Sequence, residues 1–262
     1  VAMGTSAPEA AVSIAAAVKG NADITIGNIV GSNILNILVI LGLAASIVPI
    51  AVARSTVRIE IPFMIGVTAL LFYQGRDSSI SLADGGVLMV AFAAYMMYLY
   101  TMAMKSNVDS DLEEPGLPLG RCLLGAVGGL ALIIAGSNVT VGAATSIATY
   151  AGLSERFIGL TIVALGTSLP ELFTSVAAAR RGNADIAIGN IVGSNIFNIL
   201  FVVGLSSLII DIPFASAFNF DTYVALGAAV LLWLCVLRTQ RLQRWAGALM
   251  LMCYAAYLGY IL

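Results

Sequence analysis

The chain has 262 residues, of which 60% are hydrophobic and 10% charged, and its formal net charge is −2. This composition excludes a soluble globular protein, because several apolar runs reach the roughly 20 residues that a helix needs to cross a bilayer. Histidine is absent, which removes the commonest metal ligand and the commonest proton carrier near neutral pH. The three cysteines lie in apolar stretches and indicate neither a disulfide framework nor a metal cluster.

Hydropathy predicts nine membrane-spanning helices. In chain order they cover approximately residues 1–18, 24–52, 59–75, 82–104, 120–150, 156–179, 186–210, 221–238 and 242–262. Among the connections, only segment 105–119 has much polar length. We expect it to be a cytoplasmic linker, because it lacks the ligand spacing and the turn glycine of an EF-hand calcium loop.

One unit occurs twice in the chain, at an offset of 162 residues. Residues 4–43 align with residues 166–205, and about 28 of these 40 positions are identical. The same offset relates Gly85 to Gly247 and Tyr95 to Tyr257, so the repeated unit is a bundle of helices rather than a short motif.

The repeat predicts how the chain is organised. The span at 120–150 has no counterpart in the first half, so we expect ten spans (five plus five) in the intact protein, with the first helix missing from this chain. The predicted units are an N-terminal repeat (1–104), the linker (105–119) and a C-terminal repeat (120–262).

The two repeats are expected to face opposite sides of the membrane, because an odd number of crossings separates equivalent spans. Nine of the twelve basic residues fall in alternate connections, and Lys19, Arg76 and Arg156 are the three on the other side. Since basic loops stay in the cytoplasm, this asymmetry supports the inversion and places Leu262 outside. The sequence therefore predicts an all-α membrane protein with an inverted-topology repeat.

A polar motif interrupts one span in each half. Residues 4–9 read Gly-Thr-Ser-Ala-Pro-Glu, and residues 166–171 read Gly-Thr-Ser-Leu-Pro-Glu. A carboxylate inside a bilayer is costly and marks a functional site, and no basic residue lies in the middle of a span to pair with Glu9 or Glu171. Matching breaks in the two halves of a duplicated chain point to an ion site at the repeat interface.

Glycine and proline loosen the helix at each motif. We therefore expect free backbone carbonyls around Ala2, Thr5, Ala164 and Thr167. Carbonyls, hydroxyls and a carboxylate together form an all-oxygen ligand set, which suits Na⁺ and Ca²⁺. It does not suit zinc or copper, which prefer histidine or cysteine.

The helix after each motif carries a second pattern, Gly-Asn-x-x-Gly-Ser-Asn-x-x-Asn, at 27–36 and at 189–198. Ser32 and Asn36 share one helix face, and so do their counterparts Ser194 and Asn198. We expect the last asparagine of each copy to be a ligand. The other amides are expected to join helices, at Asn28, Asn33, Asn190 and Asn195. The glycines are expected to be packing contacts, at Gly27, Gly31, Gly189 and Gly193.

A shorter repeated segment precedes each of these helices. It reads Gly-Asn-Ala-Asp at residues 20–23 and again at 182–185. We expect the glycine to end one helix and the aspartate, Asp23 or Asp185, to cap the next.

These paired motifs resemble the α-repeats of the calcium/cation antiporter superfamily, and the whole pattern is similar to prokaryotic sodium/calcium exchangers. The resemblance implies a cation site formed by residues Ala2, Thr5, Ser6, Glu9, Ser32, Asn36, Ala164, Thr167, Ser168, Glu171, Ser194 and Asn198. Many relatives carry aspartate where this chain has Asn198, so the functions of that charge are not carried over.

The resemblance implies a secondary antiporter, not an enzyme, that exchanges Ca²⁺ for Na⁺ in the cytoplasmic (inner) membrane of a prokaryote. Its partners would be these two ions and the lipid bilayer, with no prosthetic group and no nucleic acid. Two carboxylates balance one Ca²⁺, and the same oxygens hold several Na⁺ instead, so the ions compete. A calcium/proton exchanger that protonates Glu9 and Glu171 is the nearest alternative, and a cation channel is the alternative from another class.

Overall fold

The computed structural model describes residues 1–18, 23–106 and 158–261, together with individual positions between 120 and 152. The predicted linker, apart from its first two residues, and the predicted span at 120–150 lie largely outside the described residues.

The described part of the first half is helical apart from two very short strands. Its elements are α1 (Ala2–Thr5), α2 (Ala7–Val18), α3 (Asp23–Leu35), the π-helical turn η1 (Asn36–Leu41), α4 (Gly42–Ile47), β1 (Ile50–Ala51), the π-helical turn η2 (Thr56–Glu60), α5 (Ile61–Gln74), the 3-10 turn η3 (Gly75–Asp77), β2 (Ser79–Ile80) and α6 (Leu82–Ser106).

The second half repeats this order. Its elements are the π-helical turn η4 (Gly159–Val163), α9 (Ala164–Thr167), α10 (Leu169–Arg180), α11 (Ala184–Phe197), the π-helical turn η5 (Asn198–Val203), α12 (Gly204–Ile209), β3 (Ile212–Pro213), α13 (Ala217–Leu237), β4 (Arg241–Leu242) and α14 (Arg244–Ile261).

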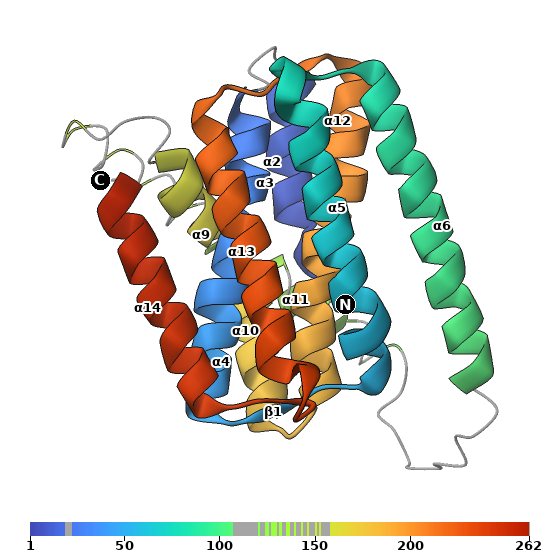
Figure 1. Ribbon diagram of the computed structural model, residues 1–262, viewed down its shortest axis with the longest axis vertical. Helices are drawn as coiled ribbons and strands as arrows, with labels where there is room; N and C mark the ends of the chain where they lie inside the picture. Colours follow the sequence, from blue (N-terminus) through green and yellow to red (C-terminus); the bar gives the residue numbers. More distant parts are fainter. Residues whose placement is uncertain are drawn as a thin grey trace.

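The helices run side by side in one bundle, with α6 and α14 on its outer sides (Figure 1). The rods α3–η1–α4 and α11–η5–α12 are mostly buried, whereas α6 is mostly exposed, as expected of a helix that faces lipid. Within the described residues, five helices are long and apolar enough to cross a membrane. The bent pair Leu160–Thr167 and Leu169–Arg180 makes a sixth candidate.

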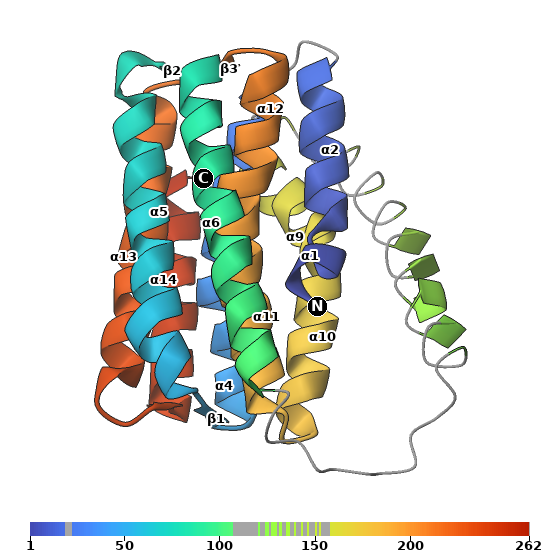
Figure 2. The same cartoon turned by 90° about the vertical axis from the view of Figure 1, so that its right-hand side faces the viewer.

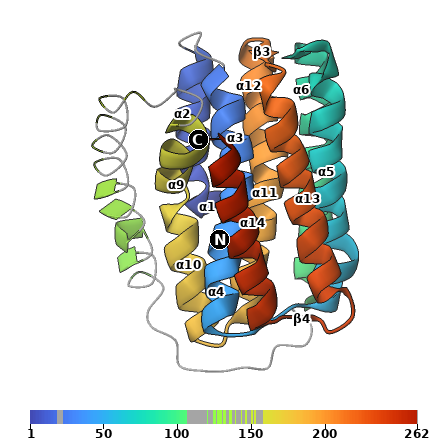
Figure 3. The same ribbon diagram turned by 60° about the vertical axis from the view of Figure 1, so that its left-hand side comes forward.

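Two antiparallel ribbons tie the halves together, one at each end of the bundle (Figures 2 and 3). Strand β1 pairs with β4, with Ile50 opposite Leu242, and β2 pairs with β3, with Ile80 opposite Ile212. These four residues are related by the same 162-residue offset, which maps one ribbon onto the other. Because the two ribbons lie at opposite ends, the two halves are inverted, as the sequence predicts.

Each predicted span other than 120–150 coincides with described helices, but three boundaries were wrong. The span at 24–52 is too long because Val48 adopts an extended conformation, as expected of a residue that precedes proline, and β1 follows. The span at 242–262 starts with the last residue of β4, and its helix begins at Arg244. The span at 221–238 begins earlier, at Ala217.

Two glycines allow the outer helices to approach the inner rods closely. A Cβ atom on Gly85 of α6 would lie 2.9 Å from the Gly204 carbonyl oxygen of α12. A Cβ atom on Gly247 of α14 would lie 2.6 Å from the Gly42 carbonyl oxygen of α4. Small residues at such crossings let backbones pack without a hydrophobic driving force in lipid. The same contact therefore fixes the outer helix in both halves.

This crossing is testable with two neighbouring glycines. Gly85→Ala should lower the free energy of unfolding by about 1–3 kcal/mol, because the methyl group meets the Ser207 hydroxyl and the Gly204 carbonyl oxygen. Gly86→Ala is the matched control, since nothing lies within 4 Å of a Cβ at that position. Thermal melting of the purified protein in detergent measures both, and equal melting temperatures would contradict the crossing.

Candidate cation site

The repeated Gly-Thr-Ser-x-Pro-Glu motif breaks its span in both halves. Helix α1 ends and α2 begins around Ser6 (φ −83°, ψ 9°), and α9 and α10 meet at Ser168 (φ −86°, ψ 6°). The helix bends by 56° at the second break. Pro170 lies in the first turn of α10, where a missing N–H costs nothing. Each break therefore places one glutamate in the first turn of a new helix, Glu9 in α2 and Glu171 in α10.

The prediction of free carbonyls was half wrong. The Ala2 carbonyl accepts the Ser6 amide at 3.0 Å, and the Ala164 carbonyl accepts the Ser168 amide at 3.0 Å, so the last helical bond before each break is kept. Each carbonyl also accepts the hydroxyl of the threonine three residues later. The alanine carbonyls therefore stay paired across each break.

The two carboxylates are held by serines of the opposite half. Ser6 Oγ donates to Glu171 Oε1 at 2.7 Å, and Ser168 Oγ donates to Glu9 Oε1 at 2.8 Å. Ser194 Oγ adds a longer bond of 3.3 Å to Glu171 Oε1. Both glutamates are completely buried. The two motifs therefore cross and form one cluster instead of two separate sites.

The threonines of the motifs bond to asparagines of the opposite half. Thr5 Oγ1 lies 3.1 Å from Asn190 Oδ1, and Thr167 Oγ1 lies 3.3 Å from Asn28 Oδ1. Thr167 Oγ1 is also 3.4 Å from the hydroxyl of Ser32, which brings that predicted ligand into the cluster.

The same asparagines connect helices within their own half. Asn28 Nδ2 donates to Ser13 Oγ at 3.0 Å, and Asn190 Nδ2 donates to Ser175 Oγ at 3.2 Å. The prediction that Asn28 and Asn190 join helices is confirmed. The two serines were missed, although each follows a motif glutamate by one helical turn in both copies of the repeat.

Four oxygen atoms of the cluster are buried and have no hydrogen-bond partner. They are Glu9 Oε2, Glu171 Oε2, Asn36 Oδ1 and Asn198 Oδ1, two equivalent atoms from each half. A buried polar atom without a partner costs about 1–3 kcal/mol, so such atoms are rare in folded proteins and require an explanation. Two carboxylate and two amide oxygens suit a hard cation such as Ca²⁺ or Na⁺.

The cluster does not suit a transition metal. Among the described residues, no group of three histidine, cysteine, aspartate or glutamate side chains is close enough to hold a metal ion. The cluster has only two carboxylates, and its remaining side-chain donors are hydroxyl and amide oxygens. Such a ligand set is weak for zinc or copper.

The twelve predicted site residues fall into three hydrogen-bonded groups. The first joins Glu171 to Ala2, Thr5, Ser6 and Ser194, the second joins Glu9 to Ser32, Ala164, Thr167 and Ser168, and the third links Asn36 and Asn198 through Asn33 and Asn195. Each of these twelve residues is nine-tenths or more buried except Ala2, whose carbonyl accepts a hydrogen bond from Ser194 Oγ at 3.5 Å.

The prediction that Asp185 caps α11 was wrong: the helix begins at Ala184, its N-cap is Asn183, and no side chain bonds there. Gly182 does end α10, with φ of +78°.

The glycine predictions had mixed outcomes. A Cβ on Gly31 would lie 2.8 Å from the Leu160 carbonyl oxygen, and one on Gly193 would lie 2.9 Å from Ala2 Cβ, so both are packing contacts. A Cβ on Gly27 would make an ordinary 3.5 Å contact with Phe218. Gly189 was predicted wrongly, because nothing lies within 4 Å of a Cβ there.

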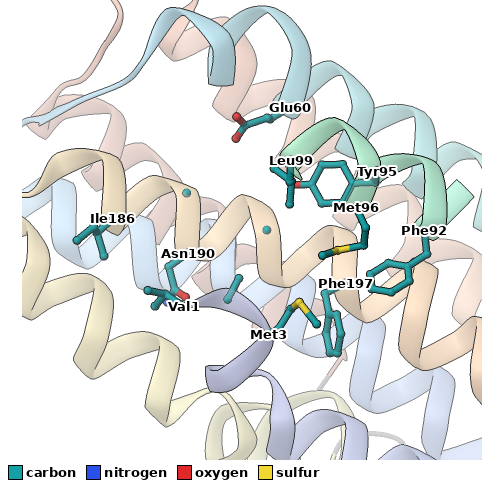
Figure 4. A pocket seen from close by; sticks show the side chains of 13 residues that line it. Val1, Met3, Glu60, Phe92, Tyr95, Met96, Leu99, Ile186, Asn190 and Phe197 are labelled. Carbon is teal, nitrogen blue, oxygen red and sulfur yellow. The ribbon is translucent and has the colours of Figure 1, made fainter. Parts of the chain in front are cut away.

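A hollow of about 290 Å³ lies over this part of α11 (Figure 4). Gly189, Gly193 and Asn190 line one wall, and Glu60 and Tyr95 line the other. The equivalent face of α3, in the first half, is covered by η4. The two halves therefore differ here, although the hydrogen bonds of the cluster are nearly symmetric.

Comparison with known proteins agrees with this architecture. The family model described as "Sodium/calcium exchanger protein" matches residues 1–101 and 122–262. The inner membrane protein YrbG of Escherichia coli (strain K12) is 40% identical over 80% of this chain and 67% of its own length. The sodium/calcium exchanger MaX1 of Methanosarcina acetivorans is 31% identical over 98% of this chain and 85% of its own.

The solved structures include a close match along nearly the whole chain. The sodium-calcium exchanger NCX_Mj, soaked with Na⁺ and Sr²⁺, superposes with a TM-score of 0.81 at 32% identity, covering 98% of this chain and 83% of that one. NCX_Mj is an all-helical membrane exchanger, and the family consists of transporters rather than enzymes. This chain is an integral multi-pass membrane protein that belongs to the sodium/calcium exchanger protein family.

Proposed function

We propose that this chain exchanges Ca²⁺ for Na⁺ by alternating access, with Glu9 and Glu171 as the charged ligands of one shared cation site. The observation that carries the proposal is the set of four buried, unpartnered oxygens in the cluster. The membership of the chain in an exchanger family supports cation exchange in general. The similarity to bacterial and archaeal proteins, among them an inner membrane protein, supports the cytoplasmic membrane of a prokaryote as its location.

The proposed ligands come equally from both halves. The carboxylates of Glu9 and Glu171 supply the charge, and the amide oxygens of Asn36 and Asn198 extend the cluster along α3 and α11. The remaining ligands are the hydroxyls of Thr5, Ser6, Ser32, Thr167, Ser168 and Ser194, and the carbonyls of Ala2, Thr5, Ala164 and Thr167. The carbonyls of Thr5 and Thr167 are the stronger backbone candidates, because the alanine carbonyls already accept two hydrogen bonds each.

The charge of the cluster explains why two ions compete for it. Two carboxylates neutralise one Ca²⁺, and the same oxygens satisfy Na⁺ ions in its place. Moving an uncompensated charge through the low-dielectric interior is expensive, so the empty cluster, with two negative charges, resists the conformational change. Ion-loaded forms are closer to neutral and cross more easily. Exchange follows, because the carrier returns only with a different ion.

The inverted repeat supplies the two access states. Equivalent helices of the two halves meet the cluster from opposite ends of the bundle, so a small relative movement exchanges the open side for the closed one. We propose that the N-terminal repeat (1–104) and the C-terminal repeat (120–262) are the structural units, joined by a cytoplasmic linker at 105–119.

Neutralising either glutamate should abolish the activity. Glu9→Gln or Glu171→Gln is expected to reduce calcium transport into proteoliposomes by about a hundredfold or more, because an uncompensated buried charge costs about 3–5 kcal/mol. The exposed Asp77 provides the control, and Asp77→Asn should transport at the parental rate. Undiminished exchange in either glutamine variant would contradict the site.

The driving ion is tested with vesicles that carry different gradients. An outward sodium gradient at uniform pH should drive calcium uptake, whereas a pH gradient without sodium should not. The ligand set favours sodium, because the cluster has only two titratable groups and many hydroxyl and carbonyl oxygens. Uptake driven by the pH gradient alone would identify a calcium/proton exchanger, and single-channel currents would identify a channel.

A further inference from the structure

Four hydrogen bonds join α3 and α11 at the point where the two halves cross. Asn36 Nδ2 donates to Asn195 Oδ1 at 2.8 Å, and Asn198 Nδ2 donates to Asn33 Oδ1 at 3.1 Å. Asn33 Nδ2 donates to the Asn195 carbonyl at 3.2 Å, and Asn195 Nδ2 donates to the Asn33 carbonyl at 3.2 Å. All four asparagines are buried, and the 162-residue offset maps each bond onto its counterpart.

The four amides do not play the same part in this arrangement. Asn33 and Asn195 use both ends of their side chains, since each donates to a backbone carbonyl and accepts from an amide. Asn36 and Asn198 use only their nitrogens, and their Oδ1 atoms are buried without a partner. In the first pair, both the nitrogen and the oxygen of each amide are hydrogen-bonded. In the second pair, only the nitrogens are hydrogen-bonded, and the oxygens have no partner.

Asn33 and Asn195 determine which way the amides of Asn198 and Asn36 point. The oxygen and nitrogen of an amide have nearly the same shape, so only the hydrogen-bond network distinguishes the two orientations. If the Asn36 amide were reversed, its oxygen would face Asn195 Oδ1, and two acceptors would meet without a proton between them. Since the Asn195 nitrogen is already bound to the Asn33 carbonyl, that residue cannot reverse at the same time without losing a bond.

We propose that Asn33 and Asn195 are positioning residues, which hold the amide oxygens of Asn198 and Asn36 toward the cation site. The inference rests on the proposed function, in which those two oxygens are ligands. Each ligand is oriented by the opposite half: Asn195 of α11 orients Asn36 of η1, and Asn33 of α3 orients Asn198 of η5. A cation meets an oxygen instead of an NH₂ group because of this pairing.

The pairing predicts which mutations depend on each other. Residues in one hydrogen-bonded pair have non-additive effects, whereas independent residues add. Asn195→Leu should weaken calcium affinity about tenfold, because the loss of one oriented ligand oxygen costs as much as a hydrogen bond to a charged group. The double variant Asn36→Leu/Asn195→Leu should be no weaker than Asn36→Leu alone, because the amide that Asn195 orients is already gone.

A control for this cycle needs a variant that shares no partner with Asn36. Asn33→Leu is unsuitable, because Asn33 and Asn36 both donate to Asn195. Thr68 Oγ1 donates to the Met64 carbonyl of its own helix, α5. Thr68→Val should therefore leave calcium affinity unchanged, and combining it with Asn36→Leu should give the effect of Asn36→Leu alone.

Calcium affinity is measured as the half-saturating concentration for exchange in proteoliposomes. For variants that do not transport, it is measured as the calcium-dependent rise in melting temperature of the purified protein. If a leucine variant fails to fold, the cycle is repeated with alanine at the same position. Coupling of Asn195 with Asn36, and additivity of Thr68 with Asn36, is the expected result.

Two outcomes would overturn the inference, and they differ in what they say about the site. If all pairs are additive while Asn36→Leu still weakens binding, Asn36 remains a ligand and the asparagines only join helices. If Asn36→Leu and Asn198→Leu both leave calcium affinity unchanged, the ligand assignment itself fails. The transport activity of the glutamine variants, Glu9→Gln and Glu171→Gln, tests the proposed function separately from either outcome.

Discussion

The constraint on which the structure depends is the burial of two negative charges beside each other in the middle of a membrane protein. Among the described residues, neither Glu9 nor Glu171 has a basic partner to offset its charge, and the bonds that their carboxylates receive come from serine hydroxyls. Those serines belong to the opposite motif, so the cost of each charge is met only when both halves are assembled. The helix breaks, the crossing of the motifs and the amides of the inner rods all follow from this need for oxygen-bonded, dipole-rich surroundings.

The breaks show how little backbone has to be disrupted to build such surroundings. The Ala2 and Ala164 carbonyls keep their amide partners, because a single residue at each break, Ser6 or Ser168, leaves the helical conformation. Irregular backbone at membrane depth is tolerated where it is buried in protein or lines a wet cavity. The fold therefore limits the irregular backbone to one residue in each motif.

Much of the fold was predictable because the sequence contains the same structural unit twice. The 162-residue repeat, the odd number of crossings and the asymmetry of basic residues together predict the inverted bundle, and hydropathy predicts its spans. The residues of the candidate site were predictable for the same reason. Polar residues recur at equivalent positions of both repeats within otherwise apolar helices, and such residues are not expected to face lipid. Ser13 and Ser175 recur in the same way and were overlooked, because a single serine in an apolar helix is common.

What the sequence could not predict depends on how one helix is rotated against another. Spacing along α3 places Asn33 and Asn36 on neighbouring faces, but it does not say that Asn36 meets Asn195 across the bundle. The ribbons were missed because strands of two residues have no periodicity to detect. The prediction that Asp185 is a cap failed because α11 begins one residue before Asp185, and a sequence pattern does not fix a helix end to within one residue.

The ribbons also limit how this carrier deforms. Each ribbon takes one strand from either repeat, β1 with β4 and β2 with β3, so backbone hydrogen bonds join the halves at both ends of the bundle. Sliding one whole repeat past the other would break these bonds. The ribbons therefore hold α4, α5, α12 and α13 in a single frame, and any change of access has to keep these four helices together.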